Sequence, residues 1–182
     1  EHFSTVCTDN DEVGLMAATK IRQKGYTEAA IFASRHSYFA TSQRVQAFIS
    51  SCERLGIETD EKYILKGSST RNGGYEIGKQ YAALKEPPKM IFCDSDAIAL
   101  GALRAFHEEG ISVPGDAELL SIGMLDPEAA SYYVPSLSVV EMPNKEIGQQ
   151  VLRLMRKKVL NNDMSSEHVK VHAKLMLRES FS

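Results

Sequence analysis

The sequence predicts an α/β fold in which a mostly parallel sheet is flanked by helices. Short apolar runs alternate along the chain with longer windows of helical periodicity, a pattern typical of strand–helix–strand units. Gly25, Gly56 and Gly110 each follow a helical window and precede an apolar residue, as expected where a left-handed residue closes a helix. The 182 residues are enough for one good core or two small lobes.

Each element is predicted from its own pattern. Strands are expected where short apolar runs are rich in β-branched and aromatic residues, at 3–8, 29–33, 63–65, 90–93, 119–122, 138–140 and 169–177. Helices are expected at 12–24, 42–55, 71–84, 97–109 and 145–160. Side chains that can cap a helix precede three of them, at Asn10 or Asp11, Ser95 or Asp96, and Asn144.

Charge and composition argue against several classes of protein. The net charge is −3 and no long Lys/Arg run is present, so these residues offer no strong footprint for nucleic acid. The apolar stretches are far shorter than the roughly 20 residues that span a bilayer, and no membrane association is expected. Cys7, Cys52 and Cys93 show no CxxC pairing, and no secretory signal is in view, which together predict a reduced, cytoplasmic protein.

No motif for catalysis or metal binding is assembled. The glycine-rich segment 67–74 lacks the spacing and the lysine of a phosphate-binding loop and is interpreted as a polar turn that caps a helix. No GxSxG elbow is present, and His168 and His172 lie on a predicted strand, about 13 Å apart. We therefore expect no enzyme, no metal and no cofactor.

Two polar features lie where predicted strands run into helices. Asp94 and Asp96 are either a carboxylate pair for acid–base or cation chemistry, or a helix cap with an acceptor for a ligand; the second needs fewer assumptions. Arg44 lies one turn inside a helix, after a polar loop. Its guanidinium either extends into solvent or aims its donors at the space above the sheet, where it could hold hydroxyls or a carboxylate.

Several segments, in the right order, resemble the lactose/galactose-repressor (LacI/GalR) family of bacterial regulators. They cover the whole chain: Asp9-Asn10 with Gly14, Ala17-Ala18 and Gly25-Tyr26; Arg44-Val-Gln-Ala47-Phe48, with Ala47 in place of the family's Gly; residues 88–103; residues 110–116 with Ser121-Ile122-Gly123; residues 133–140; Ile147-Gly148; and Leu177-Arg178-Glu179-Ser180.

The resemblance implies a type I periplasmic-binding-protein-like fold, with a ligand cleft between two lobes and three crossover strands. Residues 27–140 and the last strand would form a complete C-terminal lobe. Residues 1–26 and 141–165 would be elements of a partial N-terminal lobe. The DNA-binding helix-turn-helix would be absent from this chain, which opens on Glu1 and a strand, so we expect a fragment of a longer protein.

The resemblance also implies site residues. The expected effector-binding residues are Arg44, Ser69, Ser95, Asp96, Leu125 and Asp126, and the expected dimer-interface residues are Leu100, Leu103 and Arg104, for which core packing is the alternative. Leu125 replaces a ligand-contacting Asp of the family, Met142 stands where a polar Gln is common, and no aromatic residue lies near 68–70. The effector is therefore expected to be a sugar or a modified, less polar derivative.

The implied function is that of the ligand-sensing and dimerisation region of a transcription regulator. A small molecule held between the lobes would control operator binding by the absent DNA-binding domain of a homodimer. The alternative is a solute-binding protein of a transport system with the same fold. An α/β enzyme is a third possibility, but no nucleophile–base pair is assembled.

Overall fold

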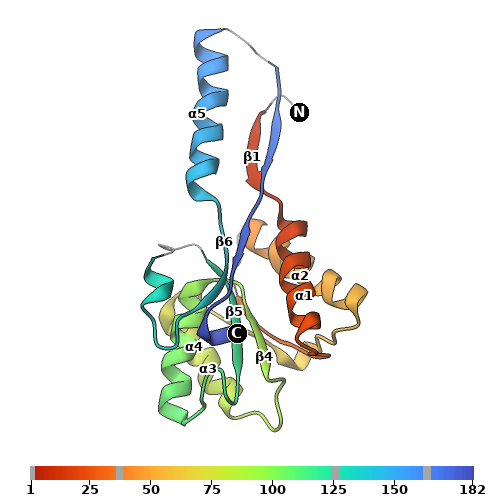
Figure 1. Cartoon of the computed structure of the whole chain (residues 1–182), viewed down its shortest axis with the longest axis vertical. Helices are drawn as coiled ribbons and strands as arrows, with labels where there is room; N and C mark the ends of the chain where they lie inside the picture. The colour runs from red at the N-terminus through yellow and green to blue at the C-terminus, as the bar shows by residue number, and fades with distance from the viewer. Residues whose placement is uncertain (1–2, 36–38, 124–127, 162–164) are drawn as a thin grey trace.

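The computed structural model describes residues 3–35, 39–123, 128–161 and 165–182, with the side chains of 39–41 left out of the description. The predicted fold class is confirmed. A broad α/β body lies below a narrow extension in Figure 1, and the chain passes between these two parts three times.

The body is built on a six-stranded sheet with the order β3-β2-β4-β5-β6-β8. Its strands are β2 (Ala30–Ser34), β3 (Ile64–Gly67), β4 (Met90–Cys93), β5 (Glu118–Gly123), β6 (Ser138–Glu141) and β8 (Lys174–Met176). Neighbouring strands are parallel except for β8, which runs antiparallel to β6. The parallel strands therefore end at one edge of the sheet, where ligands of such folds bind.

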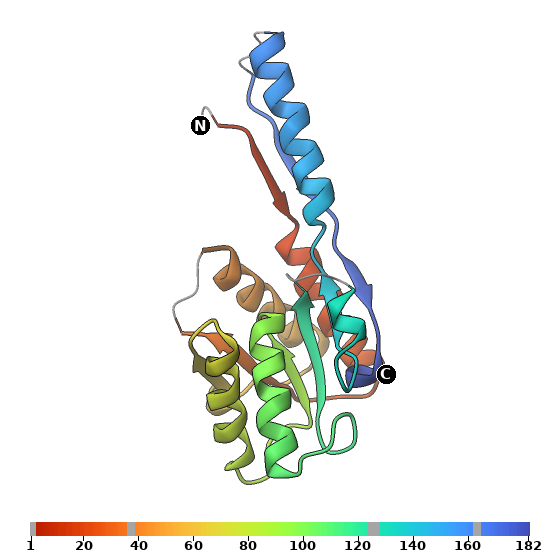
Figure 2. The same cartoon turned by 90° about the vertical axis from the view of Figure 1, so that its left-hand side faces the viewer.

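Two pairs of helices cover the sheet, and each pair has its own core (Figures 1 and 2). Helices α1 (Asn10–Gln23) and α2 (Phe39–Leu55) pack with Ile31, Phe92 and their neighbours, whereas α3 (Arg71–Ala82) and α4 (Asp96–Glu109) pack with Phe32, Ile91 and theirs. Because successive strand residues point to opposite faces, strands covered on both sides are apolar throughout. This explains the continuous apolar runs of the sequence.

Both helix pairs approach so closely that a glycine is needed where they cross. A Cβ at Gly14 of α1 would lie 2.4 Å from the Ala47 carbonyl carbon of α2, and a Cβ at Gly101 of α4 would lie 1.9 Å from the Arg71 carbonyl oxygen of α3. The predicted helix ends are also confirmed: Gly110 has a φ of +71°, and the next N–H, of Ile111, donates to the Phe106 carbonyl at 2.9 Å.

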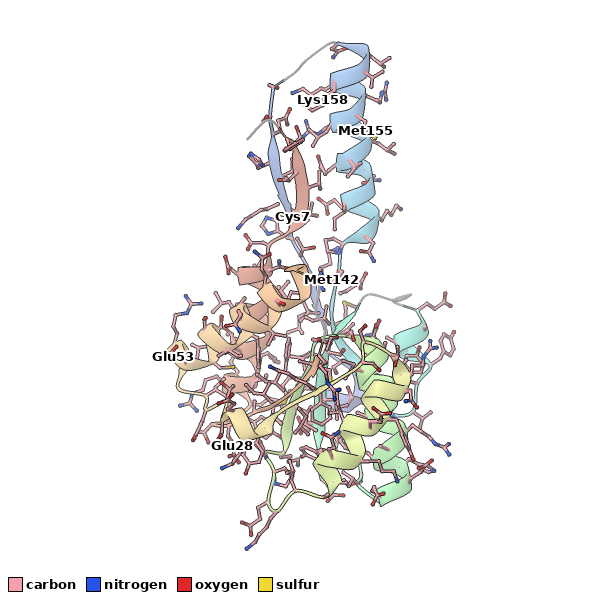
Figure 3. All side chains as sticks on the ribbon, turned by 180° about the vertical axis from the view of Figure 1, so that it is seen from behind. Cys7, Glu28, Glu53, Met142, Met155 and Lys158 are labelled. Carbon is pink, nitrogen blue, oxygen red and sulfur yellow. The ribbon has the colours of Figure 1, made fainter. Side chains whose placement is uncertain are left out.

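The extension consists of β1 (Thr5–Thr8), β7 (His168–Val171) and the long helix α5 (Asn144–Leu160). Strands β1 and β7 pair in parallel as a separate two-stranded sheet. Figure 3 shows Met155 and Lys158 on α5, Cys7 on β1, and Met142 where the body meets the extension. Leu154 is the one buried residue of α5, so the extension has little core of its own.

The expected division of the chain requires a correction at α1. We expected residues 1–26 to belong to the N-terminal lobe, but Val13, Ala17 and Ile21 of α1 are fully buried in the same core as Phe48 and Phe92. Of the described part of this segment, residues 3–8 lie in the extension, whereas the apolar face of α1 packs against α2 and the large sheet.

The expected last strand, 169–177, is two strands with different partners. Its first half, β7, pairs with β1 in the extension, and its second half, β8, pairs with β6 in the body. Beyond β8, the Ser180 hydroxyl accepts the Ser138 N–H and donates to the Leu119 carbonyl, both at 2.8 Å. The closing Leu-Arg-Glu-Ser segment therefore fastens the end of the chain to β5 and β6.

The three crossovers lie between β1 and α1, between β6 and α5, and between β7 and β8. Ion pairs join the first to the third: Lys170 Nζ lies 2.9 Å from Asp9 Oδ2, and His172 Nδ1 lies 2.8 Å from Glu12 Oε2. Asp9 also caps α1, since its side chain accepts the Glu12 N–H, so the cap lies one residue before the expected Asn10.

Candidate functional site

Polar side chains gather where β2 and β4 end and where α2 and α4 begin. This is the edge at which the strand-to-helix loops of the parallel sheet meet. Arg44 comes from the second turn of α2, and Ser34 from the last position of β2. Asp94 and Ser95 lie between β4 and α4, and Asp96 is the first residue of α4.

Arg44 is buried, with 7% of its surface exposed, so the solvent-exposed alternative is wrong. Its Nε donates to Asn10 Oδ1 at 3.3 Å, and Asn10 Nδ2 donates to Gln43 Oε1 at 3.1 Å. Burial lowers the pKa of the Arg44 guanidinium, and the negative charge of Asp94 opposes this shift. A buried cation is thus held at the expected edge of the sheet.

Asp94 directly follows β4 and is fully buried, and it was missing from the expected effector residues. Its Oδ2 accepts the Ser34 N–H at 2.6 Å, whereas its Oδ1 has no hydrogen-bond partner among the residues that the structure describes. Burial raises the pKa of Asp94, while hydrogen bonds from Ser34 and Ser95 and the positive charge of Arg44 oppose the rise. The Asp-Ser-Asp pattern marked this acid, but nothing in the sequence indicated its burial.

Ser95 and Asp96 form the start of α4. The Ser95 hydroxyl accepts the Ile98 N–H at 3.5 Å, which confirms the helix-cap interpretation for this residue. Asp96 is buried in the first turn, where the positive end of the helix dipole favours a carboxylate. Both residues therefore have structural roles at the same place as their expected effector role.

Ser69 is the one described residue among the remaining expected effector residues. Ser69 is exposed in the loop between β3 and α3, where Thr70 caps α3 by accepting the Gly73 N–H, as expected of a polar capping turn. Leu125 and Asp126 lie outside the described residues. Met142 is buried in the core under α1 and α2.

The expected dimer residues lie along α4. Leu100 is half-buried, and Leu103 is half-buried against the core beneath α3 and α4, so core packing accounts for part of its surface. Arg104 is exposed and forms an ion pair with Glu108 at 2.7 Å within the same helix.

Two open grooves flank the junction of body and extension. One of about 740 Å³ lies between the start of α1 and α2 and includes Asn10 and Gln43, which link it to Arg44. The other, of about 730 Å³, lies beside the second and third crossovers and includes Met142 and His172. Arg44 and Asp94 line neither groove.

Across the described residues, no group of three or more His, Cys, Asp or Glu side chains is arranged to hold a metal ion. Within the same residues, no helix combines the length and apolar character needed to cross a membrane.

Comparison with known proteins identifies the family. The model of the periplasmic binding protein-like domain matches residues 18–181. The chain belongs to this family. Its curated relatives include the HTH-type transcriptional repressor PurR of Mannheimia succiniciproducens, 27% identical over 169 residues, and PurR of Escherichia coli O1:K1 / APEC, 27% identical over 179 residues. These alignments cover 93% and 98% of this chain but 50% and 52% of the relatives, so the chain spans about half their length.

Solved structures of this periplasmic binding protein-like family agree. A LacI family transcription regulator from Clostridium acetobutylicum superposes with a TM-score of 0.91 and 30% identity, covering 96% of this chain and 65% of that one. A LacI family regulator from Enterococcus faecium with bound ribose shares the fold, with a TM-score of 0.85, 20% identity, and coverage of 98% and 65%. The resemblance to the effector-binding portion of LacI/GalR regulators is thereby confirmed.

Proposed function

We propose that this chain is the ligand-sensing and dimerisation region of a cytoplasmic transcription regulator. In this proposal a sugar or sugar derivative binds at Arg44, Ser69, Ser95, Asp96, Leu125 and Asp126 and controls operator binding by a DNA-binding domain elsewhere in the protein. The curated relatives are repressors, which favours regulation over solute transport and over catalysis. One neighbour was solved with ribose and another, a regulator named CelR, with cellobiose.

The observation that carries the proposal is the buried Arg44 at the carboxyl edge of the sheet. A guanidinium there presents several donors in a fixed plane, and it can hold two oxygens of a ligand at once. Because the cation is already largely desolvated, a ligand that meets its donors forms stronger hydrogen bonds than it would at the surface.

A thermal-shift screen of the complete gene product tests this proposal. The probes are ribose, cellobiose, hypoxanthine and guanine, so that sugars are compared with purine bases. A ligand at about 100 times its Kd adds about 2.7 kcal/mol of stability, which raises the Tm of a unit the size of this chain by roughly 5–10 °C. Arg44→Ala should abolish the shift, whereas Arg22→Ala, at an exposed position of α1, should leave it. A shift that survives Arg44→Ala contradicts the site.

Dimerisation is tested separately on α4. We propose that Leu100, Leu103 and Arg104 face a second copy of the chain. Arg104→Glu reverses the charge of an exposed side chain without touching the core. Sedimentation equilibrium should show a weaker dimer for this variant than for the unmodified protein, and equal dimer affinity would contradict this placement of the interface.

A further inference from the structure

We propose that one side of helix α5 is a docking surface for an acidic, partly apolar segment of a partner protein. The surface, here called the basic groove, runs from Gln149 to Asn161, includes Leu152, Arg156 and Leu160, and encloses about 410 Å³. This inference goes beyond the effector site and the dimer face proposed above, and it depends on neither of them.

The basic groove lies on a different side of α5 from the small sheet of the extension. Leu154 and Val151 point toward β1, where they line an apolar groove together with Val6. The basic groove shares no residue with that one. Its residues recur at intervals of three and four, so they lie together along the helix. Figures 1 and 2 show α5 in the extension, away from the helices of the body.

The basic groove has an exposed leucine near each end. Leu152 is 63% exposed and Leu160 is 69% exposed. They are two turns apart, about 12 Å along the helix, and Arg156 lies one turn from each. A single exposed apolar side chain is ordinary, but two of them on either side of a cation form an amphipathic strip. A partner that covers both leucines removes apolar surface from water.

The cations of the basic groove differ in how they are held. Arg153 Nη2 lies 3.0 Å from Glu167 Oε2, and Lys157 Nζ lies 2.5 Å from Glu167 Oε1, so these two are fastened to the start of β7. Arg156 is exposed and forms no ion pair within the described parts of the chain. A planar guanidinium can hold a carboxylate with two parallel hydrogen bonds. The donor at the centre of the strip is therefore available to an acidic group.

The combination of charge and apolar surface favours a protein partner over other anions. The phosphate backbone of DNA attracts cations but offers no apolar surface that would cover the leucines. A membrane takes up the whole apolar face of a helix, whereas one apolar side of α5 already faces β1. An acidic protein segment supplies carboxylates and apolar side chains together, as in interfaces that centre on an arginine.

The alternative is that these residues only favour the helix itself. Leucine and arginine are good helix formers, and cations near the C-terminal end of a helix interact favourably with its dipole. This role requires no common ligand for the leucines and Arg156. A docking surface, in contrast, requires that both kinds of side chain contribute to the affinity for one acidic segment.

The test measures fluorescence anisotropy of a labelled helical peptide with the complete gene product. The peptide has about 14 residues, enough to follow the roughly 18 Å of the groove, and presents alternating glutamates and leucines on one face. One control peptide has Gln for Glu, and the other has Ala for Leu. The peptide with glutamates and leucines should bind with a Kd below about 1 mM, and each control about tenfold more weakly or worse. Raising NaCl from about 50 to about 500 mM should weaken binding of the first peptide but hardly affect the Gln control.

Matched variants locate the binding. Arg156→Gln should weaken binding of the first peptide by about tenfold, and Leu160→Ala should weaken it by about threefold or more. Arg22→Gln and Leu15→Ala make the same changes at exposed positions of α1 and should leave the affinity unchanged. All four positions are exposed, so the Tm should change little. A lower Tm in Arg156→Gln without a change in affinity would indicate the purely helical role and overturn the inference.

Other outcomes also overturn it. These are an absence of saturation up to about 1 mM peptide, equal binding of the three peptides, or equal binding by the unmodified protein and Arg156→Gln. Vesicles with phosphatidylserine, or duplex DNA, replace the protein partner if they bind more tightly than the peptide and Arg156→Gln weakens that binding. A weaker dimer of Arg156→Gln in sedimentation equilibrium assigns the groove to a second copy of the chain. The comparison of the three peptides needs no variant, so it decides the question even if a variant does not fold.

Discussion

Replacing Gly14 by alanine tests the close packing of α1 against α2, the helix that carries Arg44. An added Cβ would lie 2.4 Å from the Ala47 carbonyl carbon and 2.6 Å from the Phe48 nitrogen, both backbone atoms that no side-chain rotation can move away. The helices must therefore separate. Overpacking of this kind costs about 1–3 kcal/mol, which outweighs the roughly 0.5–1 kcal/mol that alanine gains over glycine within a helix.

The net effect is a loss of about 1–2 kcal/mol, or a decrease in Tm of roughly 2–8 °C for a protein of this size. Gly148→Ala is the matched control, because a Cβ at this position of α5 meets nothing within 4 Å. It should raise the Tm by a few degrees. Thermal unfolding followed by circular dichroism measures both variants, and an equal increase in Tm for Gly14→Ala would refute the packing argument.

Three further predictions concern other parts of the molecule. Ser180→Ala leaves a buried backbone N–H without its partner and should lower the free energy of unfolding in urea by about 1–3 kcal/mol, whereas Ser50→Ala, on the exposed side of α2, should change it by less than about 0.5 kcal/mol. The pKa of His172 is raised above its usual 6.5 by its partner Glu12, so the ion pair stabilises the protein at acidic pH, and this contribution is lost as the pH rises through the raised pKa. The difference in Tm between the unmodified protein and His172→Gln should therefore fall toward zero between about pH 5.5 and about pH 8.5. A difference that stays constant over this range would exclude the ion pair. Cys7 is exposed, whereas the thiols of Cys52 and Cys93 are buried and their pKa values are raised. A thiol reagent should therefore modify one cysteine in the native protein and three after unfolding. Fast modification of more than one cysteine in the native protein would contradict the burial of Cys52 and Cys93 in the core.

Most of the fold could be predicted from the sequence because its strands are short and its helix ends are marked. The run Met90–Cys93 is a strand at the predicted bounds, and Gly110 closes α4 as its position after the helical window predicted. The last strand could not be divided in advance, because alternating side chains do not show that the pairing partner changes between Val171 and Lys174.

The location of α1 shows the same limit. Its apolar stripe predicts a buried face but not the sheet that buries it, so the resemblance alone assigned it to the wrong part of the molecule.

The candidate site was predicted less completely. The helical pattern and the resemblance pointed to Arg44, but the burial of Asp94 depends on how β2, β4 and α2 come together, which the sequence does not show.

The pairing of β8 with β6 has a consequence for how the protein is made. Strand β6 is complete once Glu141 is synthesised, but its free edge stays open until β8 follows α5 and β7. During that interval the apolar residues of β6 present unpaired backbone groups, which is the kind of edge that joins other chains. Premature termination before Lys174 should therefore give an aggregation-prone product, even though most of the sheet has already been synthesised.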